Sequence, residues 1–162
     1  MTDPLRVLIV EDSASDAELI LRALEQGGYR PAYLRVETPG DFSAALDTGL
    51  WDVIISDHSL PQFSSTAALA IVKARAVDLP FIVVSGSIGE ETAIMLMKAG
   101  AHDYVVKDSL ARLVPVVDRE LREAAVRREA RQAEDARRRS EQQFRSLIEH
   151  ALDINAIFDR DG

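Results

Sequence analysis

The chain has 162 residues, of which 47% are hydrophobic, enough apolar material for one ordinary domain with an appendage. It contains no cysteine, which excludes disulfides and thiolate metal sites, and its net charge of -8 argues against a nucleic-acid-binding surface. No signal peptide is visible and the apolar runs are too short to cross a bilayer, so we expect a cytoplasmic protein with neither nucleic-acid nor membrane partners.

Short runs rich in Val and Ile alternate with stretches of helical periodicity through the first 117 residues. This alternation is typical of a doubly wound α/β domain, in which helices cover both faces of a parallel sheet. The strands that we predict are Leu5–Val10, Tyr33–Val36, Val53–Ser56, Phe81–Ser85 and Tyr104–Val106. Helices are predicted near Ser15–Gln26, Gly40–Asp47, Ser65–Arg75 and Glu90–Lys98, with a fifth from about Ser109.

The fifth predicted helix lacks an obvious stop signal. Between Leu110 and about Arg139 there is no glycine and no proline after Pro115, and the strong helix formers Ala, Glu, Arg and Gln dominate. Apolar residues recur at roughly heptad spacing up to Arg127, beyond which alanines replace them. We therefore expect an extended C-terminal helix with a linker over residues 118–139, which is either a solvated connector or part of a coiled coil that pairs two copies.

The last segment of the chain has a different pattern. A short amphipathic helix is predicted over Ser140–Glu149, a strand over Ile154–Phe158 and a turn over residues 159–162. One helix and one strand bury too little apolar surface to form a domain. Residues 140–162 are therefore expected to be the beginning of a second, truncated domain.

Polar residues stand at the carboxyl ends of four of the predicted strands. Glu11 and Asp12 follow the first strand, Asp57 the third, Ser85 ends the fourth and Lys107 follows the fifth. In an open parallel sheet, ligands bind beyond these ends. Three carboxylates gathered there would repel one another without a cation, and Mg²⁺ or Mn²⁺ suits such oxygen ligands. Beside the ion, Asp57 could act as a nucleophile on phosphorus and become an acyl phosphate.

These stretches resemble the receiver domain of two-component response regulators. The residues that carry the resemblance are Val7–Asp12, Asp52–Asp57 with Leu60 and Pro61, Phe81–Gly86 and Ala99–Lys107. The resemblance covers nearly all of residues 5–117. It implies a receiver domain over residues 1–117 with a flavodoxin-like sheet in the strand order 2-1-3-4-5.

The resemblance also implies which residues bind the metal and accept the phosphoryl group. Asp57 would be the phosphorylated aspartate, and Glu11 and Asp12 would be the acidic pair that holds the metal with it. Ser59 would offer the metal its backbone carbonyl oxygen.

Three further residues match positions that respond to phosphorylation in the family. Lys107 would be the cation on the phosphoryl group, and Ser85 would be the switch hydroxyl that moves toward it. Tyr104 would be the aromatic rotamer switch, although a half-buried core aromatic is the other interpretation of this residue.

What the resemblance implies about partners is that a histidine kinase or a histidine phosphotransfer protein donates the phosphoryl group in a phosphorelay. The domain would assist its own phosphorylation and dephosphorylation without being an enzyme. Residues 140–162 resemble the opening helix and first strand of a PAS sensor domain. The parent protein is therefore expected to be a histidine kinase or a diguanylate cyclase.

A phosphatase of the haloacid dehalogenase type is the alternative from another functional class. It would also use Asp57 as its nucleophile in a doubly wound fold. Such enzymes place a second aspartate two residues after the nucleophile as acid and base, and this chain has Ser59 there. The missing acid and base makes this the weaker hypothesis.

Overall fold

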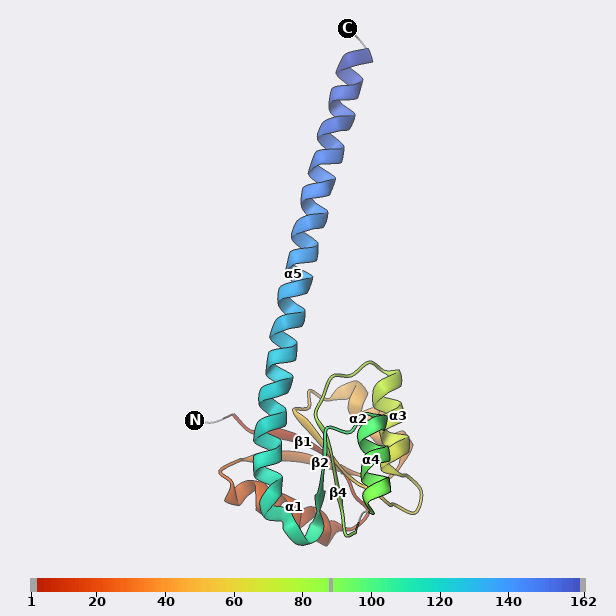
Figure 1. Cartoon of the computed structure of the whole chain (residues 1–162), viewed down its shortest axis with the longest axis vertical. Helices are drawn as coiled ribbons and strands as arrows, with labels where there is room; N and C mark the ends of the chain where they lie inside the picture. Colours follow the sequence, from red (N-terminus) through yellow and green to blue (C-terminus); the bar gives the residue numbers. More distant parts are fainter. Residues whose placement is uncertain (1–2, 88, 161–162) are drawn as a thin grey trace. The chain divides into compact units, whose positions relative to one another are not determined.

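The computed structural model describes residues 3–87 and 89–160, which divide into two compact units after Ala124 (Figure 1). The first unit contains all five strands. Its elements, in chain order, are β1 (Leu5–Val10), α1 (Ala14–Gln26), β2 (Pro31–Val36), α2 (Pro39–Thr48), β3 (Val53–Asp57), α3 (Ser65–Ala74), β4 (Phe81–Ser85), α4 (Glu90–Ala99), β5 (Asp103–Val106), the 3₁₀ helix η1 (Lys107–Arg112) and the beginning of α5 (Leu113–Arg160).

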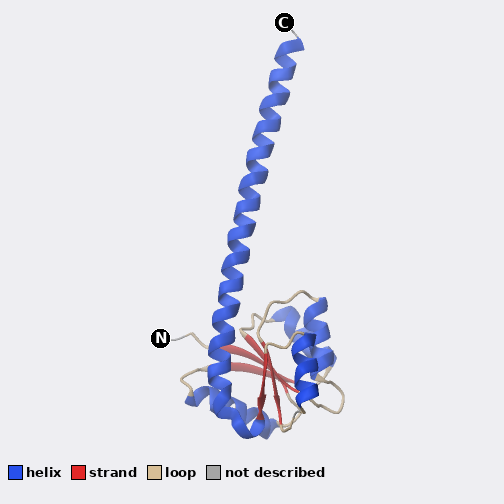
Figure 2. Ribbon diagram, viewed as in Figure 1, coloured by secondary structure: helices blue, strands red, loops and turns tan. Residues whose placement is uncertain are grey.

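The five strands form one parallel sheet in the order β2-β1-β3-β4-β5 (Figure 2). The predicted fold class and strand order are therefore confirmed. β3 and β4 are buried along their whole length, as the near-continuous apolar runs of central parallel strands require. The order changes direction between β1 and β3, which is the point where ligands gather in such sheets.

Two apolar clusters cover the two faces of the sheet. Successive residues of β1 alternate between them: Val7 and Ile9 pack against α1 and residues 113–117 of α5, whereas Leu8 and Val10 pack against α2, α3 and α4. Burial of one such side chain stabilises the fold by about 1.5–3 kcal/mol. This two-sided core holds the carboxyl ends of the strands in fixed positions.

Side-chain caps begin three of the helices that follow these strand ends. The hydroxyls of Ser13, Thr38 and Ser64 each accept a hydrogen bond from a backbone N–H of the first helical turn, at 3.2, 3.2 and 3.1 Å. Such caps satisfy N–H groups that have no partner within the helix. They determine where the loops after β1, β2 and β3 end.

The predicted strand bounds need only small corrections. β2 begins at Pro31 rather than Tyr33, β3 includes Asp57, and β5 begins at Asp103. Where a regular helix was predicted from about Ser109, the chain first forms the 3₁₀ helix η1. Ser109 has φ of -125° and ψ of 43°, which is not helical, so α5 begins only at Leu113.

The second unit, residues 125–160, is helical throughout and belongs to α5. The predicted strand over Ile154–Phe158 is wrong, because α5 continues to Arg160. A short strand needs a neighbouring strand for its hydrogen bonds, and no glycine or proline stops the helix before it. The predicted turn also fails at residues 159–160, while residues 161–162 lie outside the described residues. None of the helices in the described part of the chain has the length and apolarity to cross a membrane.

The surface of the second unit combines ion pairs with exposed apolar side chains. Arg137 forms ion pairs with Glu134 and Glu141, one turn away on either side, at 2.7 and 2.9 Å. The exposed apolar residues of the unit include Val126, Phe144, Leu147, Ile148, Leu152 and Ile154.

Candidate functional site

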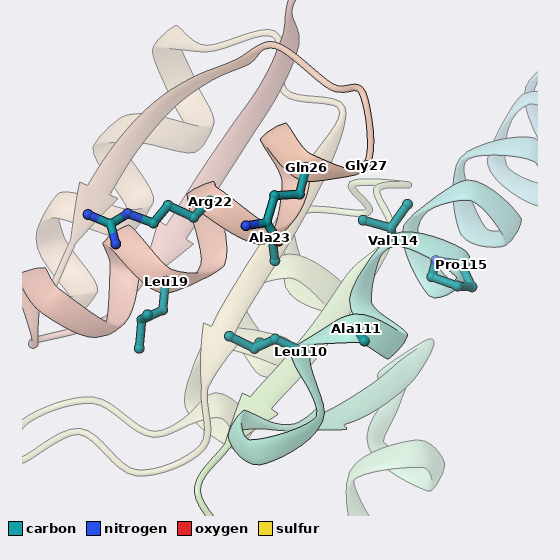
Figure 3. Close-up of a pocket in the computed structure, with 9 residues that line it drawn as sticks. All are labelled: Leu19, Arg22, Ala23, Gln26, Gly27, Leu110, Ala111, Val114 and Pro115. Atoms are coloured by element: carbon teal, nitrogen blue, oxygen red, sulfur yellow. The ribbon is translucent and has the colours of Figure 1, made fainter.

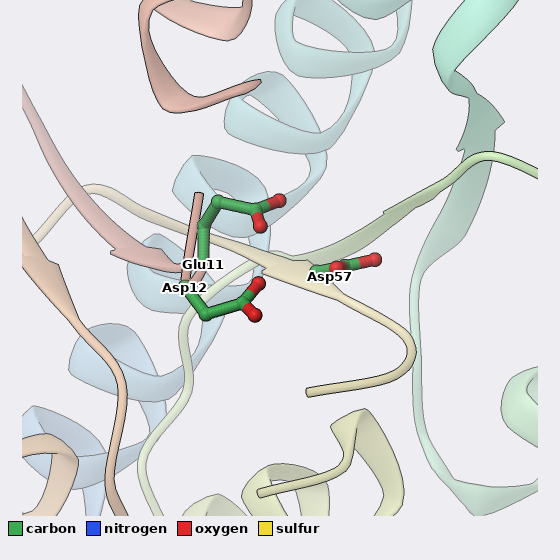
Figure 4. Close-up of side chains that lie close together, drawn as sticks. All are labelled: Glu11, Asp12 and Asp57. Carbon is green, nitrogen blue, oxygen red and sulfur yellow. The ribbon is translucent and has the colours of Figure 1, made fainter. Parts of the chain in front are cut away.

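Three carboxylates meet at the carboxyl edge of the sheet. Glu11 and Asp12 follow β1, and Asp57 ends the neighbouring strand β3; Val10 and Ser56 pair in register, so the residues after them lie side by side. One oxygen of each carboxylate lies within 4.8 Å of the other two, and Figure 4 shows the three side chains together. This confirms that the sequence brings Glu11, Asp12 and Asp57 to one place.

The environment of Glu11 disfavours its ionised form. Its side chain is 1% exposed, and this burial is the main cause that raises its pKa to about 7. The neighbouring Asp12 and the charge of Asp57 raise the pKa further. The N–H of Ser13, which donates to Glu11 Oε1 at 3.1 Å, and the ammonium of Lys107 lower it.

The donor set fits a hard divalent cation. Mg²⁺ prefers a small number of carboxylate oxygens and completes its octahedron with water. Glu11, Asp12 and Asp57 could supply those oxygens, and Asp12 is exposed, so water can reach this side of the cluster. A cation would also remove the repulsion that raises the Glu11 pKa.

Lys107 brings a positive charge to the same cluster. Its Nζ lies 3.1 Å from Glu11 Oε2, 2.6 Å from Asp16 Oδ2 and 3.6 Å from Asp57 Oδ2. Burial lowers the pKa of Lys107, but the hydrogen bonds to Asp16 and Glu11 outweigh it and the pKa is raised. The ammonium therefore stays charged beside Asp57.

Ser85 lies on β4, the strand next to that of Asp57, and Tyr104 lies on β5, one strand further along the sheet. Asp57 pairs with Val84, so Ser85 is one residue further toward the edge, where it is buried. Tyr104 is half-buried against the core on the α4 side and lines a pocket with Ile94 and other residues of α4. These positions are compatible with Ser85 as the switch hydroxyl and Tyr104 as the rotamer switch, and equally with Tyr104 as a core aromatic. Both switch roles therefore stay predictions.

Ser59 lies in the loop between β3 and α3, which is held by several contacts. Ser59 forms a bridge with Ser64, the N–H of Ser65 donates to the His58 carbonyl at 3.2 Å, and His58 Nδ1 lies 2.8 Å from Ser65 Oγ. The loop that carries the Ser59 carbonyl is therefore braced next to Asp57. That this carbonyl binds the metal remains a prediction.

Two residues at the site were missed by sequence reasoning. Asp16 makes the shortest contact to Lys107. It stands four residues after Asp12, at the beginning of a predicted helix, and this position could have indicated that it lies near the acidic residues. Arg35 on β2 donates to the backbone carbonyls of Glu11 and Asp12 at 3.1 and 3.4 Å. It holds the loop after β1, and no pattern in the sequence indicated it.

A separate pocket of about 600 Å³ lies between α1 and the segment from η1 to the beginning of α5 (Figure 3). It is lined mainly by apolar and small residues, including Leu19, Gly27, Leu110 and Val114. None of the predicted site residues lines it. The pocket is therefore distinct from the acidic cluster.

Comparisons with known proteins agree with this geometry. A sequence model of the response regulator receiver domain matches residues 7–118. The phosphate regulon transcriptional regulatory protein PhoB of Klebsiella pneumoniae is 32% identical over 107 residues, which are 63% of this chain and 44% of that protein. The matched region thus spans less than half of that relative.

Solved structures show the same fold. The signal receiver domain of a protein described as a Luxo repressor from Vibrio parahaemolyticus aligns with a TM-score of 0.70 at 26% identity, over 79% of this chain and 98% of that one. The beryllofluoride-activated NtrC4 receiver domain dimer aligns with a TM-score of 0.64 at 25% identity, over 74% and 98%. Through residues 7–118, this chain belongs to the response regulator receiver domain family.

Proposed function

We propose that residues 1–117 accept a phosphoryl group on Asp57 in a two-component phosphorelay. The observation that carries the proposal is the convergence of Glu11, Asp12 and Asp57 with the ammonium of Lys107 at one edge of the sheet. Phosphoryl transfer needs mainly positioning and charge neutralisation, and this arrangement supplies both.

The donor would be a phosphohistidine on a histidine kinase or a histidine phosphotransfer protein. A carboxylate oxygen of Asp57 forms the new bond to phosphorus while the bond from phosphorus to the imidazole nitrogen breaks. The bonding electrons stay with that nitrogen, and because the other ring nitrogen of the phosphohistidine carries a proton, the donor leaves as a neutral imidazole. Asp57 is only 9% exposed, so the donor has to place its phosphoryl group directly above the cluster.

Glu11, Asp12, Asp57 and the backbone carbonyl of Ser59 would hold Mg²⁺ or Mn²⁺. When bound, the ion would neutralise charge on the phosphoryl oxygens. Lys107 would contribute the second positive charge, and Ser85 would donate its hydroxyl to a phosphoryl oxygen. Movement of Ser85 would leave room for Tyr104 to turn inward, which would shift the population of two conformations of the α4 and β5 surface.

The output belongs to a longer protein in this proposal. A PAS domain beginning at residues 140–162, within a histidine kinase or diguanylate cyclase, stays a proposal that rests on sequence resemblance, and the helical course to Arg160 does not support its first strand. A homodimer through α5 is proposed because Val126, Ala133, Ser140, Leu147 and Ile154 recur at seven-residue spacing, and Val126, Leu147 and Ile154 are exposed.

The test is phosphorylation by a small acyl phosphate in the presence of Mg²⁺. We expect the intact protein to gain the mass of one phosphoryl group, located by peptide mapping on Asp57, and to lose this gain when a chelator removes the metal. Asp57→Asn should not gain it. Asp52→Asn is the matched control, because Asp52 precedes the same strand and pairs instead with Arg6 at 2.9 Å. An Asp57→Asn protein that gained the same mass at the same rate would remove the assignment.

A further inference from the structure

The shortest contact of Lys107 is with a carboxylate outside the predicted site. Its Nζ lies 2.6 Å from Asp16 Oδ2, nearer than to Glu11 at 3.1 Å or Asp57 at 3.6 Å. Asp16 belongs to the first turn of α1, whereas Lys107 follows β5. The contact therefore ties α1 to the end of a strand on the other side of the acidic cluster.

A simpler explanation of Asp16 is that an acid in the first turn stabilises a helix. That role needs only the position in the helix and proximity to its N-terminal N–H groups. The N-cap itself is supplied by Ser13, whose hydroxyl accepts from the N–H of Asp16 at 3.2 Å. The capping role therefore leaves the contact between the Asp16 side chain and Lys107 unexplained.

The ammonium of Lys107 has three protons to donate; two hydrogen bonds go to Glu11 and Asp16, whereas Asp57 lies at 3.6 Å, beyond hydrogen-bond distance. Phosphorylation turns the Asp57 carboxylate into an acyl phosphate whose phosphoryl group carries about -1.5 to -2 charges on three acceptor oxygens, a net gain of at most about one negative charge over the free carboxylate. To come within hydrogen-bond distance of those oxygens, the ammonium has to move toward Asp57, which lengthens its contact with Asp16 or Glu11. Glu11 is needed by the metal, whereas Asp16 is 35% exposed and can return to water.

We propose that Asp16 is a positioning residue that holds Lys107 in the unphosphorylated receiver and competes with the phosphoryl group for its ammonium. The inference rests on the proposed function, because it requires a phosphoryl group at Asp57. Removing the Asp16 charge frees Lys107 and strengthens the binding of a phosphoryl group or its mimic. The same change in a chain without the Lys107 ammonium has no such effect.

The experiment measures the affinity of the whole chain for beryllofluoride, a phosphoryl mimic, in saturating Mg²⁺ by isothermal titration calorimetry. Partly exposed ion pairs contribute modestly, so Asp16→Asn is expected to tighten binding by about two- to fivefold. Asp16→Ala, which also removes the hydrogen bond, should tighten it at least as much. Lys107→Met should weaken it, and adding Asp16→Asn to Lys107→Met should change nothing further.

Glu18→Gln is the matched control, because it removes a charge from an exposed position of the same helix. It should leave the affinity unchanged. Equal or weaker binding by both Asp16 variants would overturn the inference. So would an equal gain in the Lys107→Met background, which would mean that Asp16 acts by direct repulsion of the anion. If the wild-type chain bound no beryllofluoride with Mg²⁺, the proposed function itself would fail.

Discussion

Replacing Glu11 by glutamine should stabilise the metal-free protein at alkaline pH. Glu11 is almost fully buried, and its pKa is raised to about 7, mainly by that burial. Ionising it in the folded state therefore opposes folding. Glutamine has the same shape without the charge, and its Oε1 can still accept the hydrogen bond that Ser13 N–H donates to Glu11.

The sign of the pH dependence follows from proton linkage. The folded state binds the Glu11 proton up to a pKa of about 7, whereas the unfolded chain loses it near the ordinary value of 4.5. Between these pH values the folded state holds more protons, so its stability falls as pH rises, by about 3 kcal/mol in total. The attraction of Lys107 is already contained in the pKa of about 7, so we expect Glu11→Gln to be more stable than the wild type by about 3 kcal/mol at pH 8.

Urea unfolding in a chelator at pH 5 and pH 8 measures this effect directly. We expect the wild-type protein to lose stability over this interval from Glu11, and Glu11→Gln to lose less. Saturating Mg²⁺ should stabilise the wild type more than the variant at pH 8, because the metal interacts with the ionised carboxylate. Glu18→Gln, an exposed change on α1, is the control. Parallel pH profiles for wild type and Glu11→Gln would refute the reasoning.

Three further predictions concern packing, an ion-dipole contact and assembly. Gly27 lines the pocket in Figure 3, and a Cβ there would stand 2.4 Å from Val114 Cγ2, so Gly27→Ala should lower the thermal unfolding temperature. Adding Val114→Ala should restore part of this loss. A double variant no more stable than Gly27→Ala would contradict the expected clash. Overpacking of this kind costs about 1–3 kcal/mol. The Tyr29 hydroxyl donates to Asp118, and burial together with this contact raises the pKa of Tyr29 to about 12. Tyr29→Phe should therefore remove a tyrosine ionisation near pH 12 from an alkaline absorbance titration. It should also lower stability by about 1–2 kcal/mol in urea unfolding, as the loss of a hydrogen bond to a charged group does. If α5 pairs two copies, Leu147→Asp should lower the fraction of dimer in sedimentation experiments, because the Leu147 side chain is 69% exposed and free to pair, whereas Ser146→Asp should leave that fraction unchanged. A wild-type protein that is monomeric at every concentration would oppose the proposal.

The sheet and most of the acidic cluster were predictable because both depend on short-range patterns. The runs of Val and Ile in β1, β3 and β4 carry the signal of buried parallel strands, and a parallel sheet brings their carboxyl ends together. Glu11, Asp12 and Asp57 could thus be placed side by side without coordinates. The signal was weaker in β2, whose residues Ala32–Leu34 are exposed, and its predicted beginning was two residues late.

The contacts of Asp16 and Arg35 could not be read from the sequence. Asp16 meets a residue 91 positions away, and Arg35 meets carbonyl groups 23 and 24 positions away. Such contacts depend on side-chain direction across two elements, for which a single sequence carries no periodic signal. Aspartate and arginine are usually exposed to solvent, so the residue types alone gave no reason to select Asp16 and Arg35.

The wrong strand over residues 154–158 has a different cause. Its apolar run also fits one face of a helix, because Leu147, Ala151 and Ile154 recur at spacings of four and three residues. A short apolar run cannot distinguish the two structures by itself. In the absence of a partner strand, the helix satisfies every backbone hydrogen bond locally, and this decides the outcome.

The charges at the sheet edge connect the two halves of the proposed chemistry. The acidic cluster of Glu11, Asp12 and Asp57 carries excess negative charge when Glu11 is ionised, and the Lys107 ammonium beside it also contacts Asp16. A phosphoryl group would add more negative charge, and Lys107 alone cannot neutralise both. A divalent cation held by Glu11, Asp12 and Asp57 would offset this charge and leave Lys107 available in the proposed chemistry. Asp16 then determines how readily the Lys107 ammonium moves to the phosphoryl group. A residue of α1 outside the acidic cluster thus controls how strongly Asp57 holds a phosphoryl group.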